Sequence, residues 1–332
     1  MNVHFSIVVP VYNRPQEVYE LLESLKHQEY NKPYEIVIVE DGSIETSEAI
    51  VKQFPELNCS YFFKENSGPG ASRNYGMQRA QGHYFLILDS DCVLPPDYLR
   101  AVETGLKAKF TDFFGGPDAA HRDFTTLQKA INYAMTSLLT TGGIRGRKEA
   151  SKKFEPRSFN MGISKKAFEA SQGFGTIHPG EDPDLTLRLW KLGFESQLLS
   201  DAYVYHKRRI SWSKFYTQVK KFGTVRPILT RWHPESARVT FWFPSFFVLG
   251  LVVAILFALA DIGLPILMYA FYFAAIAIHA SIVNKSILIG LLSVWAVMVQ
   301  FTGYGKAFLV SKIKIGWFKK DPRAEYPHLF FE

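Results

Sequence analysis

Two acidic residues follow an apolar run in the first third of the chain. Asp89 and Asp91, separated by Ser90, come directly after residues 84–88. Side chains two residues apart on a strand point the same way, so both carboxylates could face one ligand. Hard oxygen donors at the open end of a sheet suit Mg²⁺ or Mn²⁺ bridging a diphosphate. Because turns also favour aspartate, the triplet alone is a weak indication of a metal site.

A basic residue precedes this triplet. The stretch Gly70-Ala-Ser-Arg-Asn-Tyr-Gly76 predicts a helix over about residues 71–80. This helix would place Arg73 at the same open end of the sheet as the two aspartates. The planar guanidinium could contact a nucleobase or phosphates, and an ordinary surface salt bridge is the alternative. A dinucleotide-binding loop is disfavoured, because an arginine stands where its third glycine belongs.

A second pair of carboxylates, Glu181 and Asp182, lies further along the chain. Pro183 suits a first helical position, which makes Asp182 a candidate N-cap. Asp184 and Arg188 have the spacing of a helical ion pair. Capping would hold the Asp182 carboxylate in place, so it is compatible with a catalytic role.

The strands expected to position these residues are short runs rich in Val and Ile. They cover residues 5–11, 34–39, 60–64 and 84–88, and helices are expected after Pro15, at 71–80 and at 96–108. Near-continuous apolar runs are typical of parallel strands covered on both faces, so an open, mostly parallel, Rossmann-like α/β sheet is predicted. Ligands bind beyond the carboxyl ends of such strands. The polar residues found there are Asn13, Glu40, Asp41, Asp89 and Asp91.

Beyond residue 110 the pattern is less regular. We expect a strand near 112–115, a helix near 127–139 and a strand at 202–205 that is closed by His206. A loop rich in Gly, Lys and Arg at 142–153 is expected to be a mobile element over the site.

The composition has two parts. The chain has 332 residues, 47% hydrophobic and 21% charged, which excludes disordered, collagen-like and small disulfide-rich proteins. Between Phe241 and Gly305 the only formally charged residues are Asp261 and Lys285. The sequence therefore predicts a hydrophilic domain joined to a membrane domain.

Basic residues flank the apolar part and account for most of the net charge of +7. One group lies between Lys207 and Arg238, and a second between Lys306 and Arg323. Basic flanks of apolar segments are typical of cytoplasmic anchors that face anionic lipid. Membrane lipids are therefore the predicted partners, and nucleic acid is not.

Three apolar segments, at 243–260, 264–283 and 287–304, each approach the roughly 20 residues needed to span a bilayer. Basic residues at both ends of the set favour an even number of spans, because both ends would then be cytoplasmic. Hydropathy and charge thus disagree, and a re-entrant or interfacial role for one segment stays open.

A helix is predicted from Ser211, just before these segments. One face carries its apolar residues, which are Trp212, Phe215, Tyr216, Val219 and Phe222. Its lysines lie away from that face, a pattern typical of a helix in the membrane interface. Packing on the sheet is the alternative interpretation.

Two features indicate the compartment. Cys59 and Cys92 are too few for a disulfide framework, which indicates a reducing environment. The first dozen residues lack a basic start and lead into a turn at 13–15, so no signal peptide is expected. The polar domain is therefore expected in the cytoplasm.

Four motifs in this order resemble those of a known family. They are SIVVPVYNR at 6–14, IVIVEDGS at 36–43, GASRNYGMQRAQG at 70–82 followed by LDSD at 88–91, and GEDPDLTLRLWKLG at 180–193. Over about residues 5–206 the chain resembles a family 2 glycosyltransferase of the inverting, GT-A fold type. The apolar segments resemble those of membrane-attached bacterial members that build polysaccharides or glycolipids.

The resemblance implies roles for individual residues in donor and metal binding. Asp41 would accept hydrogen bonds from the base, commonly uracil. The rest of the nucleotide donor would contact Pro10, Tyr12, Asn13, Arg73, Asp89 and Ser90. A divalent metal, Mg²⁺ or Mn²⁺, would be bound directly by Asp91, with Asp89 and, as in some related enzymes, His206. For His206, capping of a strand or contact with lipid phosphate is an equal alternative.

The resemblance also implies the reaction. Asp182, with Glu181 beside it, would be the base that removes the acceptor hydroxyl proton while the hydroxyl attacks the anomeric carbon. The sugar would move, with inversion, from a nucleotide diphosphate to a lipid-linked or glycan acceptor at the cytoplasmic face of a bacterial inner membrane. Gln218, Arg226, Arg231 and Trp232 depart in spacing from the motif of processive polysaccharide synthases, so single-sugar transfer is expected.

The expected organisation has four parts. These are a catalytic domain at 1–210, an amphipathic interfacial segment at 211–240, a multi-pass membrane region of two to three helices at 241–310 and a basic tail at 311–332. The alternative function is a non-catalytic, nucleotide-binding membrane scaffold that regulates a partner. A transporter is disfavoured, because the apolar segments contain no buried charged pair.

Overall fold

A computed structural model describes residues 4–119, 124–141, 154–206 and 211–331 of the protein. The chain divides into two compact units. The first comprises residues 1–121, 148–207 and 328–332, and the second comprises 122–147 and 208–327. Each unit is thus assembled from separate stretches of sequence.

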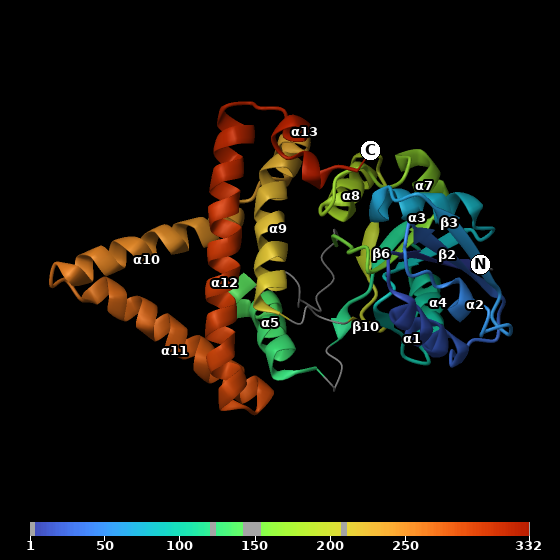
Figure 1. The fold of residues 1–332 in the computed structure, drawn as a ribbon, viewed down its shortest axis with the longest axis horizontal. Coiled ribbons are helices and arrows are strands. Elements are labelled where there is room, and N and C mark those ends of the chain that lie inside the picture. The colour runs from blue at the N-terminus through green and yellow to red at the C-terminus, as the bar shows by residue number, and fades with distance from the viewer. Residues whose placement is uncertain (1–3, 120–123, 142–153, 207–210, 332) are drawn as a thin grey trace. The chain divides into compact units, whose positions relative to one another are not determined.

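A seven-stranded sheet, counted over the described residues, forms the centre of the first unit (Figure 1). Its order is β3-β2-β1-β4-β8-β6-β9. The strands are β1 (Phe5–Val11), β2 (Tyr34–Asp41), β3 (Cys59–Lys64), β4 (Tyr84–Leu88), β6 (Phe113–Gly115), β8 (Asn160–Ser164) and β9 (Ser196–Leu198). The first four are parallel, whereas β8 runs antiparallel to β4 and β6. The predicted mostly parallel α/β sheet is confirmed.

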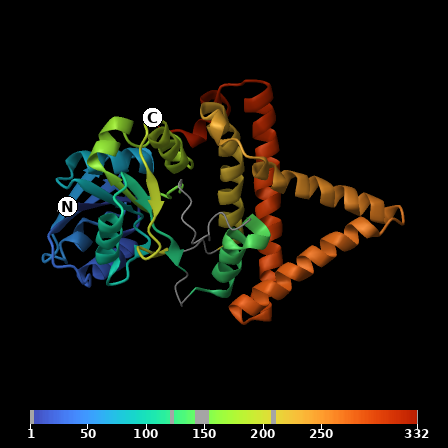
Figure 2. The same cartoon turned by 180° about the vertical axis from the view of Figure 1, so that it is seen from behind.

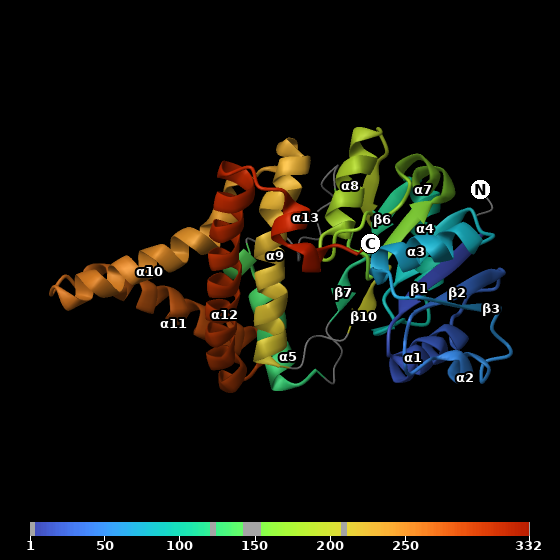
Figure 3. The same ribbon diagram turned by 45° about the horizontal axis from the view of Figure 1, so that its top comes forward.

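Helices cover both faces of this sheet. One face packs against α1 (Pro15–Lys26), α2 (Glu48–Val51) and α4 (Tyr98–Ala108). The other packs against α3 (Gly68–Arg79), α7 (Lys165–Ser171) and α8 (Glu181–Lys191) (Figure 3). Side chains alternate along β1, so that Ile7 and Val9 enter the first core and Val8 enters the second. Burial on both faces explains why the strands are almost continuously apolar.

A small three-stranded sheet lies beyond the end of β4. It is built from β5 (Cys92–Val93), β10 (Val204–His206) and β7 (Asp118–Ala119). The pairing of β10 with β5 sets His206 opposite Cys92, the residue that follows Asp91. His206 is therefore the last residue of β10, which ends one residue beyond the predicted end at 205.

The second unit is helical. Its helices are α5 (Thr126–Thr136), α6 (Leu138–Thr141), α9 (Trp212–Trp232), α10 (Phe243–Leu259), α11 (Leu264–Asn284), α12 (Ile287–Ser311) and α13 (Pro322–Glu325). Residues 312–317 continue α12 as a π-helix. The helix predicted near 127–139 is α5, and it packs with α9, α11 and α12 rather than with the sheet it follows in sequence. Ile131 and Ala134 supply its buried face.

Among the residues that the structure describes, three helical stretches are long and apolar enough to cross a membrane, at Val239–Leu259, Leu264–Asn284 and Ile287–Trp317. They agree with the three predicted segments. Helices α10 and α11 form a hairpin whose tip lies away from α12 in two opposite views (Figures 1 and 2). Most of the apolar side chains on α10 and α11 are exposed, as expected for helices that face lipid.

Helix α9 is the amphipathic helix expected from Ser211. Its apolar face packs on α12, because Gly303 of α12 has no side chain and lets Val219 and Tyr216 approach closely. Phe215 is completely buried in the same cluster. Protein therefore covers much of the face whose pattern predicts contact with the membrane interface, and an interfacial location for α9 stays a prediction.

Candidate active site

Asn13 fixes the loop that follows β2. It has a left-handed backbone with φ of 53°, a conformation that asparagine tolerates better than most residues. Its backbone N–H donates to Ser43 Oγ at 2.7 Å, and its Oδ1 accepts from the backbone N–H groups of Ile44 and Glu45 at 2.8 and 3.1 Å. Tyr12 beside it is 53% exposed. Asn13 therefore joins the ends of two strands and leaves the Tyr12 ring accessible.

Asp41 ends β2 and is almost fully buried. Its Oδ1 accepts from Lys64 Nζ at 2.5 Å and from the Ser67 backbone N–H at 2.9 Å. Glu40 instead holds structure, because its carboxylate accepts from the Ser47 backbone N–H at 2.8 Å. Of this acidic pair, Asp41 is thus the residue at the carboxyl end of the parallel strands, and Lys64 forms an ion pair with it.

The Asp89-Ser90-Asp91 triplet forms a turn. Strand β4 ends at Leu88, and the Cys92 backbone N–H donates to Asp89 O at 3.1 Å, closing the turn. The expectation that both aspartates share one strand face was therefore wrong. The turn nevertheless lies at the carboxyl end of a parallel strand beside β1, where ligands of such sheets bind.

Arg73 connects the triplet to the second carboxylate pair. It is 3% exposed, and its Nη2 donates to Asp89 Oδ1 at 2.7 Å while its Nη1 donates to Glu181 Oε1 at 3.1 Å. Its guanidinium also lies over the Phe174 ring, 5.4 Å from the centroid. The surface salt bridge considered from the sequence is excluded, because this cation is buried between Asp89 and Glu181, and Glu181 is 108 residues from Arg73 in the sequence.

Glu181 and Asp182 open helix α8. Gly180, with φ of 119°, is the residue before the helix, so Asp182 lies inside the first turn and is not the N-cap. Pro183 is the third residue of α8, and it is tolerated there because the N–H groups of the first turn have no intrahelical partner. The Asp184–Arg188 pair is confirmed, with Arg188 Nε donating to Asp184 Oδ2 at 2.9 Å. The acidic first turn also suits the positive end of the helix dipole.

The two carboxylates of this pair have different surroundings. Glu181 Oε1 lies 3.0 Å from His178 Nδ1 and also accepts from Arg73. Burial alone would raise the pKa of Glu181, but His178 and Arg73 outweigh burial and hold this pKa below its usual range. The Asp182 side chain is more accessible, at 15% exposed. Glu181 is therefore a fixed anion within the fold, and Asp182 is the carboxylate that can meet a ligand.

Burial raises the pKa of Asp182, and Arg157 partly offsets this effect. Arg157 Nη1 lies 3.6 Å from Asp182 Oδ2 and its Nη2 lies 3.6 Å from Glu155 Oε1. Glu181 and Glu155 raise the Asp182 pKa further, whereas Arg73 lowers it. A carboxylate with a raised pKa is a better proton acceptor, as a general base requires.

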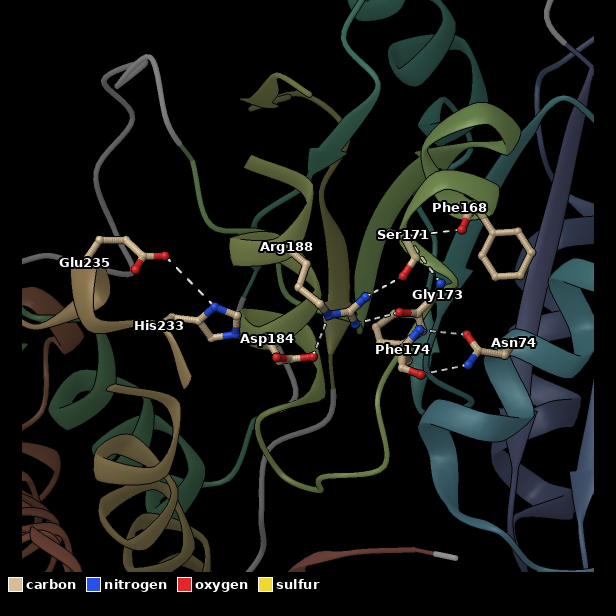
Figure 4. A network of polar contacts seen from close by, with 9 residues as sticks. All are labelled: Asn74, Phe168, Ser171, Gly173, Phe174, Asp184, Arg188, His233 and Glu235. Carbon is tan, nitrogen blue, oxygen red and sulfur yellow. Dashed lines mark hydrogen bonds and ion pairs between the residues drawn. The ribbon is translucent and has the colours of Figure 1, made fainter. Parts of the chain in front are cut away.

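Main-chain contacts hold the loop at residues 171–174 (Figure 4). Asn74 donates through Nδ2 to Phe174 O at 2.9 Å and accepts from the Phe174 backbone N–H at 2.8 Å. Arg188 donates to the backbone oxygens of Ser171 and Gly173 at 2.6 and 2.7 Å. Two motif residues thus fix the loop through its backbone, and their roles in the fold are structural.

The residues that could hold a metal are the turn aspartates. Among the described residues no three His, Cys, Asp or Glu side chains converge on one point. Mg²⁺ commonly binds through one or two carboxylates plus substrate phosphates, so Asp89 and Asp91 fit a metal that arrives with a diphosphate. Arg73 already engages Asp89 Oδ1, which makes Asp91 the main ligand in such an arrangement. The basic residues of the loop 142–153 lie outside the described residues.

Comparison with models of protein families shows which family this chain belongs to. The model of Glycosyl transferase family 2 matches residues 6–171. The chain belongs to glycosyl transferase family 2. The matched region covers β1 to α7 and therefore includes the Asp41, Arg73 and Asp89–Asp91 positions.

Curated relatives align with short stretches of this chain. An uncharacterized glycosyltransferase of Rickettsia typhi is 39% identical over 95 residues, which is 29% of each chain. Glycosyltransferase GlyA of Streptococcus pneumoniae is 37% identical over 99 residues, covering 29% of this chain and 14% of GlyA. Poly(ribitol-phosphate) beta-N-acetylglucosaminyltransferase TarS of Staphylococcus aureus is 34% identical over 100 residues, covering 29% and 18%. The match thus spans less than a third of the length of each of these relatives.

Solved structures share the fold over most of the chain. Staphylococcus aureus TarS 1-349 in complex with UDP-GlcNAc has a TM-score of 0.51 at 19% identity and covers 94% of this chain and 92% of its own. The mannosyltransferase PcManGT of Pyrobaculum calidifontis, in complex with GDP-Man and Mn²⁺, has a TM-score of 0.57 at 15% identity and covers 97% and 89%. The predicted GT-A fold is confirmed.

Three residues around the candidate site were not found from the sequence. Lys64 could have been identified, because it ends the third predicted strand at the edge of the sheet where Asp41 lies. Arg157 and His178 belong to loops without a periodic pattern, and only the fold brings them to Asp182 and Glu181. No local signal could have identified these two.

Proposed function

We propose that this family 2 member is an inverting, metal-dependent glycosyltransferase anchored in a membrane. It would transfer a sugar from a nucleotide diphosphate, with UDP the first candidate, to a lipid-linked or glycan acceptor at the cytoplasmic membrane face. The observation that carries the proposal is the ion-paired connection Asp89–Arg73–Glu181, which holds the start of α8 against the turn after β4. Asp182 is the neighbour of Glu181 and lies on the accessible side of this connection.

The chemistry assigned to the chain is a single displacement. The acceptor oxygen forms a bond to the anomeric carbon, the bond from that carbon to the diphosphate oxygen breaks, and the hydroxyl proton passes to Asp182. The electron pair of the broken bond leaves with the nucleoside diphosphate. One displacement with one base inverts the configuration of the anomeric carbon. A divalent ion, when bound, stabilises the charge of the leaving diphosphate as a Lewis acid.

The donor class is supported by the family and by the neighbours with this fold. TarS binds UDP-GlcNAc and PcManGT binds GDP-Man with Mn²⁺. In our chain, Asp41, Asn13 and Tyr12 form the side of the mouth assigned to the nucleoside, and the exposed Tyr12 ring is available to contact it. The three long apolar stretches support anchoring in a membrane. The donor site would lie on the side of that membrane that holds nucleotide sugars.

The direct test measures nucleoside diphosphate release by the full chain. Membranes containing the protein are supplied with UDP-, GDP- and TDP-sugars, Mn²⁺ and a bacterial lipid extract as acceptor. We expect release from one donor or a few related donors, with sugar appearing in the lipid or glycan fraction. Nucleotide binding without release from any donor would support the non-catalytic scaffold instead.

Asp91→Ala should uncouple nucleotide binding from the metal. In the wild type we expect Mn²⁺ to tighten UDP binding, because Asp91 would hold the ion and the ion would offset the charge of the diphosphate. The variant should lose this Mn²⁺ effect, and its turnover should fall by about 100-fold. Titration calorimetry of UDP with and without Mn²⁺ measures the effect. Asp201→Ala, at an exposed turn aspartate, is the matched control. A full Mn²⁺ effect in Asp91→Ala would contradict the assignment.

Arg157→Met should move the acid limb of the pH profile. The base acts deprotonated, so activity falls as the pH drops through the Asp182 pKa. Loss of the nearby cation raises that pKa further, and the acid limb of kcat/KM is expected at higher pH than in the wild type. Arg100→Met, which removes an exposed arginine paired with Glu29, is the control and should leave the limb in place. An unmoved limb in Arg157→Met would exclude Asp182 as the titrating base.

A further inference from the structure

Residues 328–331, which we call the returning segment, belong to the first unit although residues 208–327 before them belong to the second. Phe330 forms an antiparallel bridge with Ile177. The His178 backbone N–H donates to Leu329 O at 2.7 Å, and the Phe331 backbone N–H donates to Thr176 O at 3.0 Å. The returning segment is therefore paired by its backbone to the loop just before α8 (Figures 1 and 3).

Its side chains are packed as well. Leu329 is completely buried, although the segment is only four residues long and His328 at its start is exposed. The Phe331 ring lies against Gly68, where an added Cβ would come within 2.4 Å of the ring. Gly68 also has φ of 85°. A side chain at this position is therefore disfavoured both by the clash with the ring and by the backbone conformation. The aromatic ring occupies space that this glycine leaves open.

The contact at Gly68 reaches the nucleoside side of the site. Gly68 is the first residue of α3, and the preceding residue, Ser67, donates its backbone N–H to Asp41 Oδ1 at 2.9 Å. Lys64, which also binds Asp41, donates to Ser67 Oγ at 2.6 Å. The Phe331 ring thus packs on the backbone that presents hydrogen bonds to Asp41.

The contact at residue 178 reaches the catalytic side. The His178 ring lies 6.1 Å from the Phe331 ring, and its Nδ1 lies 3.0 Å from Glu181 Oε1. Glu181 is held in turn by Arg73, which binds Asp89. The returning segment therefore contacts the start of α3, which carries Arg73, and the loop that leads into α8, which carries Glu181 and Asp182.

We propose that the returning segment is a positioning element of the donor site, with Phe331 as its main residue. It pairs with the loop 176–178 and packs on Gly68, and so fixes the starts of α3 and α8 in the arrangement that binds and turns over the donor. Phe331 acts through Gly68 and His178 and is not itself a catalytic residue. The role rests on the proposed function, since it concerns the same donor site. Stretches at opposite ends of the sequence thereby build one site.

The test compares Phe331→Ala with Phe331→Tyr in the full chain. The alanine variant keeps the backbone pairing but removes the ring, so we expect UDP affinity to fall and the donor KM to rise by about tenfold, with a smaller change in kcat. Tyrosine retains the ring and should restore near wild-type values. Phe318→Ala, at a residue that is 70% exposed, is the control for loss of a phenylalanine from the same end of the chain.

A double-mutant cycle with Gly68 separates positioning from loss of folding. Gly68→Ala pushes the ring away without removing it, so it should raise the donor KM as Phe331→Ala does. If both act through one contact, the double variant should be no worse than the more affected single variant. Additive effects, or a KM unchanged in Phe331→Ala while wild type turns over donor, would overturn the role alone. Increased activity in Phe331→Ala would also overturn it. No release from any donor by the wild type would overturn the proposed function and the role together.

Discussion

Asp182→Asn is expected to lower kcat by about 10²- to 10⁴-fold, the range that a general base contributes. Asparagine has nearly the shape of aspartate but cannot accept the hydroxyl proton. Because the proposed mechanism assigns Asp182 to the acceptor hydroxyl and not to the nucleotide, UDP affinity should change little. Single-turnover kinetics with the best donor, together with UDP titration, measure the two quantities separately.

Two variants make this result specific. Glu195→Gln, at a side chain that is 69% exposed, should leave both quantities unchanged. Glu181→Gln should instead lower stability, because it leaves the buried Arg73 with one carboxylate fewer. Turnover in Asp182→Asn within about threefold of wild type would eliminate Asp182 as the base, since a lost base costs far more.

The sheet could be predicted closely from the sequence. Strands β1 and β4 begin and end at the residues expected from their apolar runs. Both are buried on both faces, so almost every residue carries the same signal. The sequence also predicted which strand ends would gather the polar residues, because parallel strands present their carboxyl ends at one edge.

Helix starts were less predictable. Both α3 and α8 begin earlier than expected, at Gly68 and Glu181, and each is preceded or opened by a glycine with positive φ. Such a glycine allows the chain to enter a helix from a conformation that other residues avoid. Proline was given too much weight in α8, since it is tolerated throughout the first turn and does not mark the first residue.

Contacts between distant stretches could not be predicted. Helix α5 has the ordinary amphipathic pattern, but nothing in that pattern says that its apolar face meets Phe215 and Val297 of the second unit. The bridge between Ile177 and Phe330 is likewise a long-range pairing without a local period. Motif spacing identifies functional residues that are close together in the sequence. It does not identify residues such as Arg157, which reach the site only through tertiary folding.

The charge of Arg73 should be the largest single contribution of one side chain to the stability of the first unit. Arg73→Met leaves the buried Glu181 with His178 as its remaining partner in this ion-paired group, and it removes the arginine that pairs with Asp89. Removing one member of a buried ion pair typically costs about 3–5 kcal/mol. We expect the thermal unfolding midpoint of the purified chain to fall by about 5–15 °C.

The same change should also stop turnover, because Arg73 holds the Asp89 turn and α8 together. The variant Arg73→Met with Glu181→Met removes the uncompensated carboxylate, so it should regain part of the lost stability while activity stays low. Arg14→Met, which breaks an exposed ion pair with Glu17, is the control and should change the unfolding free energy by less than about 1 kcal/mol. Recovery of turnover in the double variant would mean that the arginine only neutralises Glu181. An unfolding midpoint equal to that of wild type in Arg73→Met would show that the ion pairs contribute no net stability.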